Sequence, residues 1–340
     1  MLTREQLEAF ERDGCIGPFQ VRSESQMAEL CRTLQPLLDD PKGPPWANLT
    51  MDAHMLDENV FRLGSDPAIV DRIRSIIGDD VLFWRAWTFV KKPGAKATGV
   101  HRDGRKDQTW PTASRPREKC ASIAVWVALE PATLESGCLW VQPGSQFIRW
   151  QDEMVPRFAP VDYWMFPTRK FLDEYGVDHF TLTPKLKIGR GAWPLVCSAL
   201  RMIGAGQRIK QLFDRGNGGL VKNNFRAPPL TGLTRAEQKM WAEYAGDNVN
   251  LITIDALKRM PSKPRPLECK AGEFWIFRED MIHTAPGNNT PNRRAAVTFG
   301  YAAPDCEMHP DRFPVLIRGS NTGHNKLATP PFSIAPAAAA

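Results

Sequence analysis

The 340-residue sequence predicts a mainly β fold with flanking helices, on the evidence of two patterns. Capping residues and helical spacing occupy the chain up to about residue 78, and alternating apolar runs typical of strands follow. The strand-like runs form two blocks, at about 80–150 and 265–305. The stretch between them, about 151–264, has a mixed aromatic, basic and glycine-rich composition and is interpreted as an insertion into one β-core. We therefore expect a single domain over residues 1–340.

Three N-terminal helices are expected from their capping residues. Thr3 and Gln6 have the spacing of a capping box, and a second helix is expected from Ser25 to about Leu34. The third has Asp66 as its N-cap, with proline at the first helical position, and ends at Gly78. This third helix is expected to cover a sheet.

The strand-like runs show which face of the sheet is buried. In the run at 120–131, four apolar residues fall on one face of a strand and Trp126 falls on the other. The four are Ile123, Val125, Val127 and Leu129. Further strands are expected at Glu268–Phe277 and from Arg294 to Ala302.

Composition excludes several classes of protein. Lys and Arg outnumber Asp and Glu by only 44 to 38, and no nucleic-acid or nucleotide-binding motif is present, so no nucleic-acid partner is expected. The N-terminus is charged, and no apolar run reaches the length of a membrane span. Seven scattered cysteines without a C-x-x-C pair argue against a disulfide framework and a structural zinc site. A cytoplasmic protein with reduced thiols is expected.

Three residues have the types and spacing of an iron site. His101 and Asp103 are separated by one residue, so on an extended segment both side chains project from the same face. A short H-x-D match is weak by itself, but strand patterns precede both this motif and His283. Together the three residues would form the two-histidine, one-carboxylate triad that leaves open positions on Fe(II). Those positions can accept 2-oxoglutarate and O2, and Arg294, eleven residues beyond His283, could bind the far carboxylate of the 2-oxoglutarate.

At this point the sequence resembles the phytanoyl-CoA dioxygenase family and, within it, the branch that includes chlorinating enzymes of natural-product pathways. The matching stretches are LEAFERDGCIGPF, FVKKPGAKATGVHRD, SIAVWVALEPATLESGCLWVQPGSQ and GEFWIFREDMIHTAPGNNTPNRRAAVTFGYA. They extend across most of the β-core and the N-terminal helices, whereas the insertion carries no such resemblance.

The resemblance implies a double-stranded β-helix of the jelly-roll, cupin-like type. It also implies iron held by His101, Asp103 and His283, and 2-oxoglutarate held by Arg294 with Trp126 lying against it. Chlorinating members have Ala or Gly in place of the carboxylate ligand, so Asp103 favours hydroxylation over halogenation.

One further departure from the family concerns the co-substrate. Many relatives have a hydroxyl residue two positions after the distal histidine, where this chain has Ala285. One hydrogen bond to 2-oxoglutarate is therefore expected to come from elsewhere.

The sequence therefore predicts an Fe(II)- and 2-oxoglutarate-dependent dioxygenase. The expected reaction is hydroxylation of an unactivated C–H bond in a small-molecule or natural-product substrate, either free or tethered to a carrier or to CoA. Desaturation, epoxidation, cyclisation and the oligomeric state stay open. Two alternatives from other classes are a non-catalytic metal-binding β-helix module and a cupin-type metal-dependent hydrolase or isomerase.

Two local interpretations accompany this reading. Arg293 and Arg294 are adjacent on an expected strand, so only Arg294 should face the metal while Arg293 faces solvent. Asp52, Ala53 and His54 are interpreted as a loop that lines the pocket.

Overall fold

The structure is a computed structural model, and it describes most of the two β-blocks and the N-terminal helices. The described residues are 1–41, 49–95, 98–102, 112–113, 120, 122–147, 158–161, 164–167, 179–183, 186–189, 191–192, 195, 199, 262, 264–308 and 312–332. Most of the expected insertion, and Asp103, lie outside these residues.

The chain divides into two compact units. The first consists of Met1–Lys96, Arg102–Gln146 and Pro264–Ala340, and the second of Ala97–His101 and Phe147–Lys263. The expected single domain over residues 1–340 stays a prediction. Two antiparallel hairpins are described in the second unit: β8 (Phe158–Val161) with β9 (Trp164–Pro167), and β10 (His179–Thr183) with β11 (Leu186–Gly189).

Six helices are described in the N-terminal part of the first unit. The capping box of Thr3 and Gln6 is confirmed, and the second helix starts slightly earlier than expected because Ser23 and Gln26 form a second capping box. The third expected helix runs from its N-cap Asp66 to Gly78, as predicted. The helices are α1 (Arg4–Asp13), α2 (Glu24–Thr33), α3 (Gln35–Asp39), α4 (Ala53–Leu56), α5 (Glu58–Gly64) and α6 (Pro67–Ile77).

The larger sheet of the first unit has seven antiparallel strands in the order β1-β13-β6-β15-β3-β17, with β2 also paired to β3. The strand expected from Glu268 begins at Glu273 instead, because a turn precedes it in which Gly272 has a φ of +84°. The strands are β1 (Cys15–Gln20), β2 (Leu49–Thr50), β3 (Val81–Lys91), β6 (Ser122–Ala128), β13 (Glu273–Arg278), β15 (Arg294–Ala302) and β17 (Val315–Arg318).

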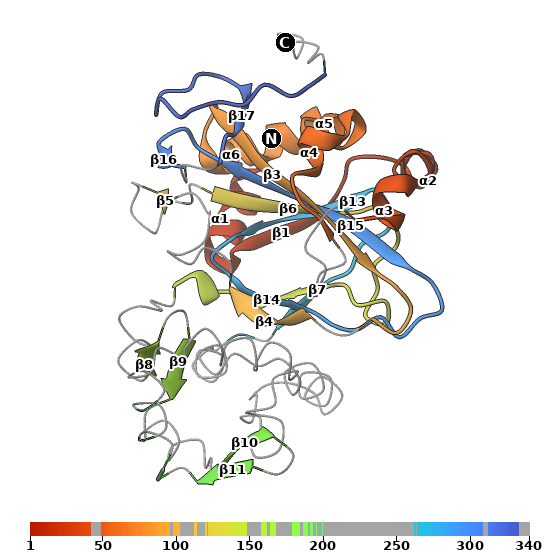
Figure 1. Cartoon of the computed structure of the whole chain (residues 1–340). Coiled ribbons are helices and arrows are strands. Elements are labelled where there is room, and N and C mark those ends of the chain that lie inside the picture. The colour runs from red at the N-terminus through yellow and green to blue at the C-terminus, as the bar shows by residue number, and fades with distance from the viewer. Residues whose placement is uncertain are drawn as a thin grey trace. The chain divides into compact units, whose positions relative to one another are not determined.

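A smaller sheet of the first unit contains the strands β12, β7 and β14, in that order. Figure 1 shows helices α4, α5 and α6 on one side of the larger sheet and strands β7 and β14 on the other. Antiparallel sheets facing each other with strands far apart in sequence as neighbours are typical of a jelly roll. The remaining elements are β4 (Thr98–Arg102), β5 (Thr112–Ala113) paired with β16 (Cys306–Glu307), β7 (Leu139–Val141), the 3-10 helix η1 (Ser145–Phe147), β12 (Arg265–Leu267) and β14 (Ile282–Ala285).

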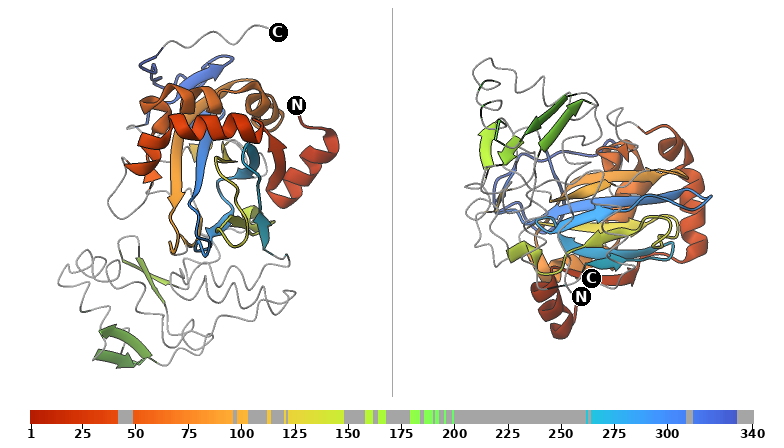
Figure 2. Two further views of the ribbon diagram at one scale, coloured as in Figure 1. Left: turned by 90° about the vertical axis from the view of Figure 1, so that its right-hand side faces the viewer. Right: turned by 90° about the horizontal axis from the view of Figure 1, so that it is seen from below.

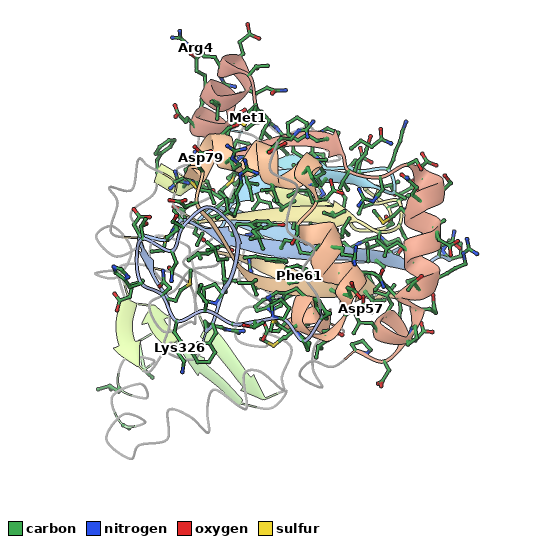
Figure 3. The ribbon with its side chains drawn as sticks, turned by 90° about the horizontal axis from the view of Figure 1, so that it is seen from above. Met1, Arg4, Asp57, Phe61, Asp79 and Lys326 are labelled. Carbon is green, nitrogen blue, oxygen red and sulfur yellow. The ribbon has the colours of Figure 1, made fainter. Side chains whose placement is uncertain are left out.

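The main hydrophobic core lies between the larger sheet and the helices. Ile123, Val125 and Val127 of β6 belong to it, together with Ile69 and other apolar residues of α6. Figure 2 shows the helices lying across one face of this sheet, and Figure 3 shows α5, with Phe61 labelled, above it. The prediction that Ile123, Val125 and Val127 share the buried face of β6 is therefore confirmed. The opposite face of β6 carries the alternate side chains of the strand. Among the residues described, no helix has the length and hydrophobicity needed to cross a lipid bilayer.

The expectation that Asp52 and His54 line the pocket differs from the structure. The side chain of His54, on α4, is 2% exposed, and its ring lies 4.5 Å from that of Phe83 in the helix-side core. The guanidinium of Arg312 instead donates to both carboxylate oxygens of Asp52, at 2.9 and 2.8 Å. A segment this short has no periodicity that could have shown which way His54 points.

Acid is expected to destabilise the protein through His54. Burial, and secondarily the charge of Arg312, lower the pKa of His54 from 6.5 to about 3. Between these pH values the unfolded chain binds a proton that the folded protein does not, so the free energy of unfolding falls as the pH falls. The full effect is on the order of 5 kcal/mol. Denaturant unfolding at several pH values should show a shallower acid dependence for His54→Phe, and an unchanged dependence would contradict the assignment.

Candidate metal and co-substrate site

His283 is presented by β14 with one ring nitrogen already engaged. Its side chain is buried, and its ring centroid lies 5.8 Å from that of Phe277 on the larger sheet. The Nδ1 atom lies 3.0 Å from the carbonyl oxygen of Met281 and donates to it. The lone pair is then on Nε2, which is the arrangement of a metal-binding histidine whose other nitrogen is held by a backbone carbonyl.

The other two expected ligands lie at the end of β4. The backbone of His101 belongs to this strand, but its side chain is not among those described, and Asp103 follows just outside the described residues. Of the three expected ligands, the described side chains thus include His283 alone. That the three residues together bind iron stays a prediction.

Arg294, the first residue of β15, is a buried cation. Its side chain is 2% exposed, one guanidinium nitrogen donates to the carbonyl oxygen of Gly137 at 2.8 Å, and Nε has no hydrogen-bond partner among the described residues. The guanidinium carbon lies 5.6 Å from the ring centroid of Trp126, within the range of a cation–π contact. Both residues predicted to hold the co-substrate are therefore in contact.

The charge of Arg294 has no described carboxylate to neutralise it. Burial lowers its pKa to about 10, against smaller opposing effects of Cys138 and Glu130. Burying an unpaired charge is unfavourable, and a bound anion would remove the penalty. A planar guanidinium whose Nε has no partner among the described residues suits a carboxylate, which can accept two parallel hydrogen bonds. The residues present therefore fit 2-oxoglutarate at this end of the site.

Gly137 is needed for the geometry around Arg294. Its φ is +78°, and a Cβ at this position would lie 2.3 Å from the carbonyl oxygen of Pro286. A side chain would therefore push apart the turn that accepts from Arg294 and the loop that follows β14.

Lys91 is a second buried basic residue that the sequence pattern did not single out. It is 7% exposed and is the register partner of Arg294 on β3. Its Nζ donates to the carbonyl oxygens of Ala285 at 2.9 Å and Pro286 at 2.6 Å. Burial, with a smaller effect of Arg294, lowers the pKa of Lys91 to about 7. The sequence offered one signal for this residue, a lysine in an alternating strand that ends in Lys-Pro-Gly. That signal could not reveal the carbonyl acceptors of Lys91, which lie almost two hundred residues away along the chain.

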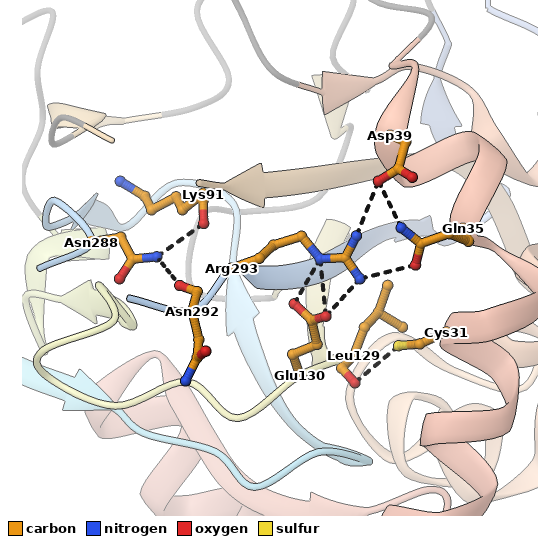
Figure 4. A network of polar contacts seen from close by, with 9 residues as sticks. All are labelled: Cys31, Gln35, Asp39, Lys91, Leu129, Glu130, Asn288, Asn292 and Arg293. Carbon is orange, nitrogen blue, oxygen red and sulfur yellow. Dashed lines mark hydrogen bonds and ion pairs between the residues drawn. The ribbon is translucent and has the colours of Figure 1, made fainter. Parts of the chain in front are cut away.

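Arg293 points away from Arg294, as predicted, but it is not simply solvent-facing. Its side chain is 24% exposed, and it forms ion pairs with Glu130 at 2.7 Å and Asp39 at 3.2 Å. It also donates to Gln35, so it joins α3 to the end of the larger sheet (Figure 4). The two adjacent arginines therefore have different roles, one structural and one facing the site.

Comparison with known proteins shows which enzymes the chain is similar to. The model of the phytanoyl-CoA dioxygenase (PhyH) family matches residues 10–169. An ectoine dioxygenase from Streptomyces coelicolor is 26% identical over 248 residues, which cover 64% of this chain and 76% of that protein.

Solved structures confirm the predicted jelly-roll fold. The structure of CytC3 with Fe(II) and alpha-ketoglutarate has a TM-score of 0.54 and 17% identity, covering 96% of this chain and 93% of that one. The non-heme alpha ketoglutarate dependent epimerase SnoN from nogalamycin biosynthesis has a TM-score of 0.51 and 14% identity, covering 90% of this chain and 82% of that one. The family match over residues 10–169 and the sequence relative make the chain similar to phytanoyl-CoA dioxygenases, and together with these structures they identify it as a non-haem iron dioxygenase that uses Fe(II), 2-oxoglutarate and O2.

Proposed function

We propose that this dioxygenase hydroxylates an unactivated C–H bond of a small molecule, with iron held by His101, Asp103 and His283. Arg294 binds the far carboxylate of 2-oxoglutarate, and Trp126 lies against the co-substrate. The observation that carries the proposal is the buried Arg294, whose Nε has no partner in the described part of the chain and whose charge no described carboxylate neutralises. An anion binding there would be oriented by the guanidinium and by the contact with Trp126.

The chain's own contribution is to bind, orient and exclude water. When bound, Fe(II) and 2-oxoglutarate would enable O2 to act as the oxidant, with one oxygen atom entering succinate as 2-oxoglutarate loses carbon dioxide and the other entering the substrate. The carbonyl of Met281 holds the Nδ1 proton of His283, which keeps the imidazole in one orientation. Burial of His283 and Arg294 keeps both groups away from bulk water, which strengthens their interactions with charged ligands.

The outcome proposed is hydroxylation because Asp103 provides a carboxylate where chlorinating relatives lack one. A filled coordination position leaves no place for chloride. Among solved structures of the same fold is an epimerase, so the fold itself does not dictate hydroxylation. Product mass distinguishes the outcomes, since hydroxylation adds one oxygen atom and desaturation removes two hydrogen atoms.

The substrate class is proposed to be a natural product or its precursor, free or tethered to a carrier or to CoA. Support comes from SnoN, a structural relative from nogalamycin biosynthesis.

We also propose that the protein is located in the cytoplasm. The six cysteines in the described part of the chain are free of disulfides, which suits a reducing compartment.

Anaerobic titration of the metal-free protein tests the proposal. Addition of Fe(II) and then 2-oxoglutarate should produce the visible charge-transfer band of a keto acid chelated to iron. Absence of a band, with iron shown to be bound, would refute the proposed co-substrate site. A metal-dependent hydrolase would instead act without O2 and 2-oxoglutarate, and a non-catalytic module would bind metal without consuming 2-oxoglutarate.

A further inference from the structure

Strand β14, which carries His283, is attached at its C-terminal end to β3. Lys91 of β3 donates to the carbonyl oxygens of Ala285 and Pro286, the last residue of β14 and the next one. The buried side chain of Asn288 continues this attachment. It donates to the backbone carbonyls of Lys91 at 3.0 Å and Asn292 at 2.7 Å (Figure 4).

The N-terminal side of β14 is attached to the same strand by a second buried cation. Arg85 of β3 forms an ion pair with Glu279 at 2.8 Å, and the two side chains are 2% and 4% exposed. Glu279 lies three residues before β14, and the hydroxyl of Ser122 on β6 also binds its carboxylate. The link therefore joins the turn before β14 to two strands of the larger sheet.

The position of Arg85 is itself fixed by its surroundings. A Cβ at Gly300 would lie 2.9 Å from Cγ and Nε of Arg85, so the absence of a side chain lets Arg85 cross β15. Its guanidinium carbon lies 4.9 Å from the ring centroid of Trp84 and 4.7 Å from that of Trp87. Contacts on several sides restrict the guanidinium to one orientation, which makes it suited to holding a partner in place.

We propose that Arg85 and Lys91 are positioning residues that set the location of His283 over the larger sheet. Six residues apart on one strand, they project from the same face, toward β14. The ladder between β14 and β7 is short, joining His283 to Val141 and Thr284 to Trp140. Buried charged hydrogen bonds at both ends of β14 add constraints that this ladder does not provide.

The consequence is a fixed geometry between His283 and Arg294. Lys91 is the register partner of Arg294, so the residue that holds the end of β14 also lies beside the guanidinium expected to bind 2-oxoglutarate. Loosening either attachment would let the imidazole move relative to the co-substrate. This inference rests on the proposed role of His283 as a metal ligand.

Metal binding provides the test, with Co(II) as a spectroscopic probe of the site. Substitutions Lys91→Met and Glu279→Gln should weaken Co(II) binding by roughly 10- to 100-fold, as expected for residues that orient a ligand, and should alter the Co(II) absorption spectrum. The conservative Lys91→Arg should recover part of the affinity. The matched control is Lys92→Met, because Lys92 is the adjacent lysine and is exposed.

The outcomes separate the positioning role from the proposed function. If His283→Gln leaves Co(II) affinity and spectrum unchanged, His283 is not a ligand and the proposed function fails. If His283→Gln abolishes binding while Lys91→Met and Glu279→Gln behave like Lys92→Met, the positioning role is overturned. Thermal unfolding of the metal-free variants confirms that each is folded, and Glu279→Gln, which preserves side-chain volume, tests the proposal even if Lys91→Met does not fold.

Discussion

Replacing Arg294 by Gln is expected to raise the KM for 2-oxoglutarate by about 10²- to 10³-fold. Removing one partner of a buried, hydrogen-bonded charge pair costs on the order of 2–5 kcal/mol, and about 1.4 kcal/mol corresponds to tenfold in affinity. Glutamine is shorter than arginine, so the hydrogen bond from the terminal guanidinium nitrogen to Gly137 is lost too, but the substitution also removes a buried charge whose burial is unfavourable. The main loss should therefore fall on co-substrate binding, and the fold should be kept.

Thermal unfolding with and without 2-oxoglutarate measures this effect before any substrate is known. A ligand that binds the folded state raises the melting temperature, so 2-oxoglutarate with a divalent metal should stabilise the wild type and not Arg294→Gln. The matched control is Arg293→Gln, since Arg293 is adjacent but binds Glu130 and Asp39. That control should respond to 2-oxoglutarate like the wild type while melting at a lower temperature. An equal response of Arg294→Gln and wild type would place the co-substrate elsewhere.

The distribution of charge within the first unit supports an anionic ligand. Arg85, Lys91 and Arg294 are buried on the face of the larger sheet that points away from the helices. Arg85 forms an ion pair with Glu279, and Lys91 donates to the backbone carbonyl oxygens of Ala285 and Pro286. The buried charge of Arg294, which no carboxylate among the described residues neutralises, favours an anionic ligand such as 2-oxoglutarate.

Elements with strong local signals could be predicted from the sequence. Helix α6 has a capping aspartate and a terminal glycine, and β15 begins at Arg294 and ends at Ala302 as expected. The short helices α4 and α5 were missed because four and seven residues are too few to show a helical period.

Residues whose role depends on distant partners could not be found in this way. Lys91 reaches its carbonyl acceptors 194 and 195 residues further along the chain, and Arg85 reaches Glu279 across 194 residues. No local pattern carries such pairings. Arg294 was found because the family resemblance and its spacing from His283 both pointed to it.

Replacing His283 by Gln is expected to reduce Fe(II) affinity by more than about 100-fold and to abolish consumption of 2-oxoglutarate. Substituting a residue that merely orients a metal ligand costs roughly 10- to 100-fold in affinity, so losing a ligand should cost more. Because His283 is buried and donates to Met281, the variant should also lose some thermal stability. Fe(II) titration under anaerobic conditions and assay of succinate formation measure the two effects.

The control for His283→Gln is His324→Asn, because His324 is exposed and lies in a different part of the first unit. Its φ is +54°, a left-handed conformation that asparagine tolerates well, so the substitution should leave the backbone unchanged. Full Fe(II) binding by His324→Asn and none by His283→Gln would assign the metal to the residue whose Nδ1 is held by Met281. Retention of stoichiometric Fe(II) by His283→Gln would instead mean that β14 does not carry a ligand, and the site would have to be sought among other residues.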